Sequence, residues 1–554
     1  MSIEIIPLGA GKEVGRSCVL VKMAGKTIMF DCGVHMGYDD ERRYPYFSYI
    51  ADTNDYTPYI DVVLVTHFHL DHCGALPYFT EMKGYNGPVI MSAPARAIIP
   101  LMLDDFRKVC VEHKGETNFY TLEMVKECCS KVRTIELHQT LTIGDINIRA
   151  YYAGHVLGAV MFYVECKGHS VVYTGDYNVV GDRHLRSAWI ERLDPNVIIS
   201  ESTYATKFRE LKMRREKVFL KKVMQTIDRG GKVLIPVFAL GRAQELCILL
   251  DTYWQRAQLD CALHFAGTLT EKANQLYKTF INWCNENVQR VFLSRNMFDF
   301  QHITQFDRGT IKSKDPMVLI ATPGMLHGGL SLSVFKEWCE DSKNTIIIPG
   351  YCVPGTVGHS LLKGADVVHI DGKEYDVRCE IQTISFSAHS DHRGILQVLR
   401  WVHPDNVVLV HGEEERMRGL CQEVQSSLGI PCYYPGNLEK LVIKFDVLTK
   451  LNMDYKILGK FKEEFHRDEI NELFGAKRGG EVRGCLYKDW IEESVLLFSC
   501  EVKGGLEEVM RKVPENVLSM IKMDEGDEGK VLVSWEAEQD EEVGKYFDSN
   551  ALAE

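Results

Sequence analysis

The sequence predicts an α/β protein with more than one domain, and three observations lead to this prediction. The chain has 554 residues, which is longer than one hydrophobic core usually serves. Its first part consists of short apolar runs separated by glycine turns and polar loops, a pattern typical of strands. From about residue 200 to 445, strand-like and helix-like segments alternate, which indicates a parallel sheet with helices on both faces.

In the first part, β-branched and apolar residues cluster in runs of strand length. Strands are predicted at residues 3–7, 17–23, 26–30, 61–66, 146–152, 160–166 and 170–174. A helix is expected over roughly residues 73–82, after a polar, histidine-rich loop.

In the second part, the spacing of apolar residues alternates between the pattern of a strand and the pattern of a helix. Helices are predicted at residues 214–228, 242–256, 392–402 and 413–428, with strands at residues 232–238, 262–266, 317–321, 345–349, 384–387, 406–410 and 441–445. Beyond about Val447 the pattern weakens, and charge runs at residues 524–528 and 536–542 are interpreted as solvated surface.

Composition limits the classes of function. The formal net charge is −13, whereas a protein that binds nucleic acid through diffuse charge is usually basic. Attraction to a polyanion must therefore be local, from a metal cluster and a few arginines in a cleft. The 17 cysteines show no repeating framework and indicate reduced thiols rather than a disulfide scaffold. We expect no signal peptide and no membrane span.

The sharpest local pattern is the segment His67-Phe68-His69-Leu70-Asp71-His72, which directly follows an apolar strand. Residues two apart in an extended segment point to one side, so His67 and His69 can hold one metal. Asp71 and His72 lie beyond the bend and can face a second metal. Three histidines and a carboxylate suit zinc, which accepts nitrogen and oxygen ligands.

Six residues cannot fill two coordination spheres, so further ligands must come from other strand ends. His155, Asp176 and His411 each stand just beyond an apolar run and beside a glycine. Asp31 has a similar setting, and we interpret it as a carboxylate that orients a ligating histidine. A lone histidine after a strand is more often a loop or core residue, but the histidine-rich segment demands partners of this kind.

This order of motifs resembles the metallo-β-lactamase fold, a four-layer αββα sandwich. The resemblance implies that one zinc is bound by His67, His69, His155 and Asp176. It implies that the second zinc is bound by Asp71, His72, His411 and the same Asp176 as a bridge.

The long insert between Asp176 and His411 resembles the β-CASP insertion of nucleases that process nucleic acids. Ser-Glu-Ser-Thr-Tyr at residues 200–204 and Ser-Phe-Ser-Ala-His at residues 385–389 match two motifs of that group, and they make Glu201 and His389 the key residues. The third motif residue is His411, and histidine there points to RNA rather than DNA. Residues 236–245 and 349–352 are typical of the eukaryotic nucleases that form RNA 3′ ends.

Within that family, residues 35–49, 138–140, 321–326 and 355–359 resemble the branch that cuts nascent RNA more than the cleavage and polyadenylation branch. The latter stays the main alternative. The implied domains are residues 1–200 and 385–446 for the metallo-β-lactamase domain, 201–384 for an inserted β-CASP parallel α/β domain, and 447–554 for a small α+β partner-binding domain.

The resemblance also implies a zinc-dependent RNA endonuclease with two Zn²⁺, in which His389 is the general acid, Glu201 orients it and Asp176 joins the metals. Partners would be RNA, a catalytically inactive β-CASP paralogue paired through the C-terminal region, and a larger RNA-processing complex in the nucleus. Two other functions remain open: a small-molecule hydrolase of the same fold, and an inactive scaffold that pairs with an active paralogue. The long insert argues against the first, and the presence of all seven candidate ligands argues against the second.

Two basic features could contact RNA. Arg242 begins a helix and could add a phosphate contact to the helix dipole. The basic run at residues 207–222 could line an RNA path, although an amphipathic surface helix with Leu, Val and Phe inward is the more common explanation of such a run. No aromatic side chain stands out in the sequence as a platform for stacking bases.

Overall fold

The computed structural model divides into two compact units, Ile3–Ile443 and a unit that contains the residues from Lys444 onward. It describes residues 2–444 except 114, 118, 239, 267–269, 293–295, 351 and 353, and five strands beyond residue 447.

The first sheet of the larger unit has seven strands in the order β22-β1-β2-β3-β4-β5-β6. Their bounds are β1 Ser2–Gly9, β2 Cys18–Met23, β3 Lys26–Phe30, β4 Val62–Leu64, β5 Val89–Ser92, β6 Val132–Ile135 and β22 Leu441–Lys444. The strands β1, β2 and β3 are antiparallel, and β3 to β6 are parallel. Helix α2 (Ala93–Lys108) packs on this sheet and α3 (Leu122–Ser130) packs on α2.

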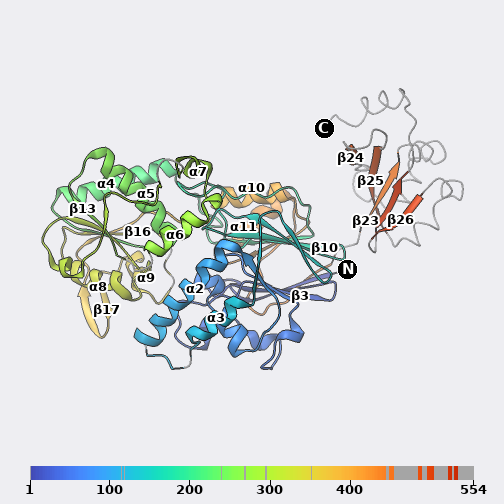
Figure 1. Cartoon of the computed structure of the whole chain (residues 1–554), viewed down its shortest axis with the longest axis horizontal. Coiled ribbons are helices and arrows are strands. Elements are labelled where there is room, and N and C mark those ends of the chain that lie inside the picture. Colours follow the sequence, from blue (N-terminus) through green and yellow to red (C-terminus); the bar gives the residue numbers. More distant parts are fainter. Residues whose placement is uncertain are drawn as a thin grey trace, which may run out of the picture. The chain divides into compact units, whose positions relative to one another are not determined.

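The second sheet also has seven strands, in the order β21-β20-β11-β10-β9-β8-β7. Their bounds are β7 Thr140–Ile143, β8 Ile146–Tyr152, β9 Val160–Cys166, β10 His169–Tyr173, β11 Val197–Glu201, β20 Val407–Val410 and β21 Cys432–Tyr433. The pairings make β8, β10, β11 and β20 run in one direction. Helices α10 (His392–Val402) and α11 (Glu414–Leu428) lie on the far side of this sheet (Figure 1).

The two sheets lie between α2 and α3 on one side and α10 and α11 on the other (Figure 1). The strands of both sheets carry the buried core, with β4 and β20 buried along their whole length. Strands buried on both faces are what such a sandwich requires. The expected four-layer αββα arrangement is therefore confirmed.

The third sheet has six parallel strands in the order β14-β13-β15-β12-β16-β19. Their bounds are β12 Val233–Pro236, β13 Ala262–Ala266, β14 Ile303–Gln305, β15 Met317–Ala321, β16 Thr345–Ile348 and β19 Glu380–Thr383. The accompanying helices are α4 Lys212–Asp228, α5 Arg242–Ala257, α6 Thr270–Thr279, α7 Glu286–Phe292, α8 Gly329–Trp338 and α9 Val357–Leu362.

Neighbouring residues of β12 face opposite sides of this sheet. Leu234 belongs to a core cluster with Trp338 of α8, whereas Ile235 belongs to another with Trp254 of α5. This alternation confirms the prediction of a parallel sheet with helices on both faces. All six strands come from residues 233–383, between β11 and β20 of the second sheet.

Two predicted elements are wrong. The strand expected at residues 384–387 is an extended loop, because the last strand of the sheet is β19, which ends at Thr383. The helix expected at residues 73–82 is broken into α1 (Leu70–Cys73) and a π-helical segment, Tyr78–Met82. A short hairpin of β17 (Val367–Ile370) and β18 (Lys373–Asp376) was not predicted.

The smaller unit contains a five-stranded sheet in the order β24-β25-β23-β27-β26. Its strands are β23 Leu448–Asp454, β24 Cys485–Lys488, β25 Leu496–Lys503, β26 Lys522–Gly526 and β27 Lys530–Ser534. The helices expected of an α+β domain there lie outside the described residues. Among the described helices of both units, none combines the length and apolar character that a membrane crossing needs.

Candidate metal centre and active site

Six strand ends meet at one edge of the sandwich. Asp31 follows β3 and His67 lies three residues after β4 in the first sheet. In the second sheet, residues at the ends of β8, β10, β11 and β20 reach the same edge, because these strands run in one direction. Ligands bind at the carboxyl ends of strands in many α/β proteins, and all seven predicted metal ligands gather here.

The first group consists of His67, His69, His155 and Asp176. Nδ1 of His69 lies 3.1 Å from Nε2 of His67 and 3.1 Å from Nε2 of His155. Oδ2 of Asp176 lies 3.7 Å from Nε2 of His67 and 3.6 Å from Nε2 of His155. Four ligand atoms therefore surround one point, as the sequence predicts for the first metal.

The second group consists of Asp71, His72 and His411. Oδ2 of Asp71 lies 3.4 Å from Nε2 of His411 and 3.9 Å from Nε2 of His72. Asp176 joins the two groups, since its Oδ2 also lies 3.3 Å from Nε2 of His72. The structure thus brings together all seven side chains, with Asp176 between the groups.

Hydrogen bonds behind the histidines direct one ring nitrogen of each toward the centre. Nδ1 of His155 donates to the carbonyl oxygen of Ala388 at 2.9 Å, and Nδ1 of His72 donates to Asp31 at 2.7 Å. A proton on Nδ1 leaves the lone pair of Nε2 free. These bonds therefore turn two imidazoles into ligands that point at the centre.

Threonine hydroxyls do the same for two more histidines, His67 and His411. Thr66 Oγ1 donates to Asp31 and lies 3.0 Å from Nδ1 of His67. Thr203 Oγ1 donates to Glu201 at 2.6 Å and lies 2.9 Å from Nδ1 of His411. Because each hydroxyl proton is used on a carboxylate, the hydroxyl oxygen accepts from the imidazole, and Nε2 again keeps its lone pair.

A bound cation fits this arrangement. Nε2 of His67 and Nε2 of His155 both face Nδ1 of His69. A proton on Nδ1 of His69 can be donated to one of them, whereas a cation between the three nitrogens would be bound by all three. Oδ1 of Asp176 is buried and has no hydrogen-bond partner. Burial lowers the pKa of His69 to about 4 and, with neighbouring imidazoles, lowers those of His67 and His155. Neutral imidazoles and carboxylates are the ligands that zinc binds.

Asp31 lies behind the ligands, as the sequence predicts. It accepts hydrogen bonds from His72, from the backbone nitrogen of Thr66 at 2.7 Å and from the hydroxyl of Tyr173 at 3.0 Å. Its backbone φ is +59°, and that of His411 is +54°. Non-glycine residues rarely adopt this region, and it is often found at functional sites.

His389, which is partly exposed, forms a pair with the buried Glu201 beside the candidate metal ligands. Nδ1 of His389 lies 2.7 Å from Oε2 of Glu201 and 3.7 Å from Oδ2 of Asp176. The backbone nitrogen of Tyr177 also donates to Glu201 at 3.0 Å. Burial by itself would lower the pKa of His389, but the Glu201 and Asp176 carboxylates raise it to about 9. The imidazole can therefore carry a proton.

Three arginines hold the loop that carries His389. Arg209 donates to the carbonyl oxygens of His389 and Ser387, and Arg215 donates to that of Ser385. Arg242 donates to the carbonyl oxygens of Phe386 and His155 at 3.0 and 3.1 Å, and to Asp182 at 2.7 Å. The guanidinium of Arg242 thus has three acceptors within the protein. The RNA contact expected of Arg242 stays a prediction.

Sequence reasoning missed the residues that fix the histidine tautomers, hold the Asp31 and Glu201 carboxylates in position and bind the loop of His389. Thr203 lies inside the recognised motif at residues 200–204, so its hydroxyl could have been noticed there. Thr66, Tyr173 and Arg209 lack such a signal, because their partners are 35 to 180 residues away in the sequence.

Three family models match successive parts of the chain. The Metallo-beta-lactamase superfamily domain matches residues 20–203, the Beta-Casp domain residues 243–361, and the Zn-dependent metallo-hydrolase RNA specificity domain residues 374–435. Together these matches cover most strands of the two sheets at the candidate centre and five of the six strands of the inserted parallel sheet, all except β12.

Full-length relatives agree with these matches. Integrator complex subunit 11 of Gallus gallus is 46% identical over 593 residues, covering 99% of this chain and 98% of the relative. Integrator complex subunit 11 of Danio rerio is 53% identical, covering 82% and 77%. Cleavage and polyadenylation specificity factor subunit 3-II of Arabidopsis thaliana is 49% identical, covering 82% and 74%.

The matched domains include the side chains gathered at the strand ends. In such hydrolases, a metal-binding centre of this kind is the catalytic centre. The chain therefore belongs to the metallo-β-lactamase/β-CASP RNA-processing nucleases, in the family of Integrator complex subunit 11, and is a metal-dependent endoribonuclease.

Proposed function

We propose that this chain cuts nascent RNA or RNA 3′ ends by two-metal phosphodiester hydrolysis, as the catalytic subunit of an Integrator-type complex. The observation that carries the proposal is the His389–Glu201 pair, whose imidazole lies 3.7 Å from Asp176, the carboxylate that joins the two ligand groups. This position supports a role for His389 as an acid–base residue beside the proposed metals.

Each metal would be a zinc ion held by residues of this chain. His67, His69, His155 and Asp176 would hold one, and Asp71, His72, His411 and Asp176 the other. Two zinc ions would offset the charge that builds up on the phosphate and would activate a water molecule near neutral pH. Asp31, Thr66 and Thr203 keep the imidazoles oriented.

His389 would protonate the leaving oxygen. Its Nδ1 faces Glu201, so Nε2 is the nitrogen left to donate a proton to substrate. When the oxygen of water bonds to phosphorus, the bond from phosphorus to the 3′ oxygen breaks and that oxygen takes the proton from His389. The products are a 3′-hydroxyl and a 5′-phosphate. Glu201 keeps the imidazole oriented and protonated.

The experiment compares the full chain with Glu201→Gln and His389→Ala on single-stranded RNA. Both variants should lose most of their cutting, by about 10²- to 10⁴-fold for loss of an acid–base group, while bound zinc and melting temperature stay unchanged. Full activity in either variant would remove the general-acid assignment. A β-lactam and a thioester, assayed in parallel, test the small-molecule hydrolase, and the zinc content tests the inactive scaffold.

Complex membership is the finer part of the proposal. The Gallus gallus and Danio rerio relatives support an Integrator-type complex in the nucleus, and the Arabidopsis thaliana relative keeps cleavage and polyadenylation as the alternative. Pairing with an inactive β-CASP paralogue would use residues 447–554, most of which lie outside the described residues. Affinity purification with mass spectrometry decides between the two sets of partners.

The proposal includes a division of the chain into domains. We propose residues 1–200 and 385–446 for the metallo-β-lactamase domain, 201–384 for the β-CASP domain and 447–554 for partner binding. The third sheet, which lies wholly within residues 233–383, agrees with the inner boundaries.

A further inference from the structure

The segment between β1 and β2, residues 10–17, contacts the second ligand group through its backbone, and we call it the β1–β2 loop. The backbone nitrogen of His411 donates to the carbonyl oxygen of Ala10 at 2.7 Å. The backbone nitrogen of Ser17 donates to the carbonyl oxygen of Asp71 at 2.7 Å. The two ends of the loop therefore hold two ligands of the second group.

The contacts of the β1–β2 loop are specific to the second group. The Ser17 hydroxyl lies 3.4 Å from Nε2 of His72, the remaining ligand of that group. In the part of the chain that the structure describes, no hydrogen bond joins the loop to His67, His69 or His155, which belong to the first group. A shift of the loop would therefore act directly on one ligand group and not on the other.

The conformation of the β1–β2 loop depends on contacts outside it. None of its residues lies in a helix or a strand. Ala10 and Arg16, near its two ends, have φ values of +55° and +47°. Non-glycine residues keep such a conformation only where the surrounding structure holds them in it. Whatever holds the loop therefore also sets the position of the second ligand group.

Asn437, in the turn before β22, makes two of these contacts. Its Oδ1 accepts from the backbone nitrogen of Gly11 at 2.8 Å, and its Nδ2 donates to Oε1 of Glu13 at 2.7 Å. A Cβ added at Gly11 would lie only 2.7 Å from the backbone nitrogen of Asn437, so the turn and the loop are in tight contact. Because the two bonds need one acceptor and one donor, an amide side chain makes both.

Glu13 passes this support on to the far end of the loop. The oxygen that accepts from Asn437 also accepts from Nε of Arg16 at 2.8 Å. The Arg16 side chain is only 6% exposed, donates to the carbonyl oxygen of Arg42 at 2.7 Å and lies over the ring of Tyr46 at 4.5 Å. A buried cation needs such a carboxylate partner. A row of side chains that begins at Asn437 thus spans the loop.

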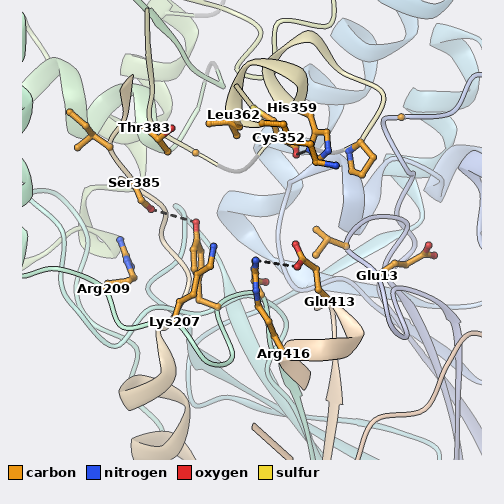
Figure 2. Close-up of a pocket in the computed structure, with 18 of the residues that line it drawn as sticks. Glu13, Lys207, Arg209, Cys352, His359, Leu362, Thr383, Ser385, Glu413 and Arg416 are labelled. Carbon is orange, nitrogen blue, oxygen red and sulfur yellow. Dashed lines mark hydrogen bonds and ion pairs between the residues drawn. The ribbon is translucent and has the colours of Figure 1, made fainter. Parts of the chain in front are cut away.

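On another side, the β1–β2 loop borders open space. A cavity of about 1120 Å³ lies beside the candidate metal centre, because Thr203 also lines it. Lys12, Glu13 and Val14 form part of its wall, and Figure 2 shows Glu13 there. Since packing on that side is incomplete, the loop relies more on the contacts that Asn437 makes.

We propose that Asn437 and Glu13 are positioning residues for the second metal. They fix the β1–β2 loop, and the loop fixes Asp71, His72 and His411. The proposal rests on the proposed function, in which each ligand group holds one zinc ion. It implies that the second zinc can be weakened from a turn that contacts no ligand side chain, while the first zinc stays as it is.

The experiment measures the zinc bound to the full chain over a series of chelator concentrations. Asn437→Ala should release one of its two zinc ions at about tenfold lower chelator concentration or less, the usual effect of losing a group that supports ligands. The other zinc should be released as in the parent. Asn437→Asp keeps an acceptor for Gly11 but places a carboxylate against Glu13, and it should weaken the same zinc.

Two further variants make the comparison specific. Glu13→Gln keeps the oxygen acceptor and loses the charge, so it should weaken the same zinc by less than Asn437→Ala does. Asn147→Ala is the matched control, because this exposed asparagine of β8 accepts a hydrogen bond from Thr142 at 2.8 Å. It should release both zinc ions like the parent. Melting temperatures measured in parallel report any general loss of stability.

His411→Ala identifies which zinc is weakened. This substitution removes a ligand of the second group, so the zinc that remains belongs to the first group. Adding Asn437→Ala to it should leave the release of that zinc unchanged. Weakening of the remaining zinc, or release like that of the parent by both Asn437 variants, would overturn the proposal.

The same measurements separate this proposal from the proposed function. Selective release of one zinc by Asn437→Ala, in a chain that binds two zinc ions but does not cut RNA, would support the role of the loop and remove the proposed function. A parent chain that binds a single zinc would overturn both.

Discussion

Nδ1 of His72 lies 2.7 Å from Oδ2 of Asp31, and both side chains are buried from solvent. Asp31 accepts this bond while Tyr173 and Thr66 also donate to it, so its position is fixed from three directions. The carboxylate therefore orients the imidazole and makes Nε2 a stronger ligand.

Asp31→Asn should weaken zinc binding without removing a ligand. An asparagine amide cannot accept from all three donors, and loss of such a partner typically costs about 10- to 100-fold in metal affinity. Competition with a zinc chelator measures the change. Asp61→Asn, at a partly exposed carboxylate that pairs with Lys26, is the control. Equal zinc affinity in Asp31→Asn and the parent would contradict the orienting role.

Gly175→Ala should damage the metal centre more than a glycine substitution elsewhere. Gly175 has φ +49°, and an added Cβ would lie 2.6 Å from Oγ1 of Thr66, the hydroxyl that holds His67. Gly25 also has a positive φ, +76°, but an added Cβ there meets nothing within 4 Å. The Gly25 variant therefore measures backbone strain alone, about 1 kcal/mol.

Melting temperature and zinc content of the two glycine variants are compared. We expect a small loss of stability and full zinc content for Gly25→Ala, and a larger loss with reduced zinc for Gly175→Ala. If the two variants have the same melting temperature and zinc content, the predicted clash with Thr66 does not affect the metal centre.

Thr203→Val should reduce cutting by about tenfold or more, because the hydroxyl fixes both Glu201 and His411 and its loss leaves buried polar groups without a partner. Thr203→Ser keeps the hydroxyl and should restore most of the rate. The kcat of both variants on single-stranded RNA, with zinc content measured in parallel, separates this role from packing. A serine variant as slow as the valine variant would indicate that the methyl group is what matters.

Local patterns predicted which side chains gather at the candidate metal centre, because they follow short apolar strands and the segment at residues 67–72 has a specific spacing. Their role as metal ligands stays a prediction. The parallel third sheet was predicted for the same reason, because β12, β13, β15 and β16 are largely apolar runs. The edge strands β14 and β19 are polar and were not predicted. The strand expected at residues 384–387 fails because arginines, rather than a neighbouring strand, bind its carbonyl oxygens. Such partners are far away in the sequence, so no local pattern reports them.

The cavity of about 1120 Å³ that Thr203 and Tyr204 line beside the candidate metal centre was also beyond local patterns. The basic run at residues 207–222 left two interpretations open, an RNA path and an amphipathic surface helix, and only the helix is tested by the structure. Lys207, Phe208 and Arg209 line the cavity, whereas Phe219 and Val223 of α4 are buried on an amphipathic helix. Exposure of Phe208 depends on the loop before α4, which composition does not reveal.

Glu245 of α5 should make the fold sensitive to acid. Its carboxylate accepts from the backbone nitrogen of Arg183 at 2.8 Å, lies 3.1 Å from Nδ1 of His184 and 3.1 Å from Nζ of Lys212. Burial by itself would raise its pKa, but His184, Lys212 and Arg242 lower it from 4.5 to about 2. A carboxylate whose pKa is lowered by folding stabilises the folded state above its unfolded pKa.

This stabilisation is complete at neutral pH and is lost as the pH falls from about 4.5 toward 2. The shift corresponds to about 3 kcal/mol of the free energy of unfolding. Glu245→Gln should therefore lower the urea midpoint of unfolding at pH 7. Between pH 5 and pH 3, the urea midpoint of the variant should fall less than that of the parent. Glu286→Gln, at an exposed carboxylate paired with Arg290, should keep the parent's acid response. If the urea midpoint of the Glu245 variant falls with acid as steeply as that of the parent, the Glu245 carboxylate does not stabilise the packing of α5 against residues 183–184.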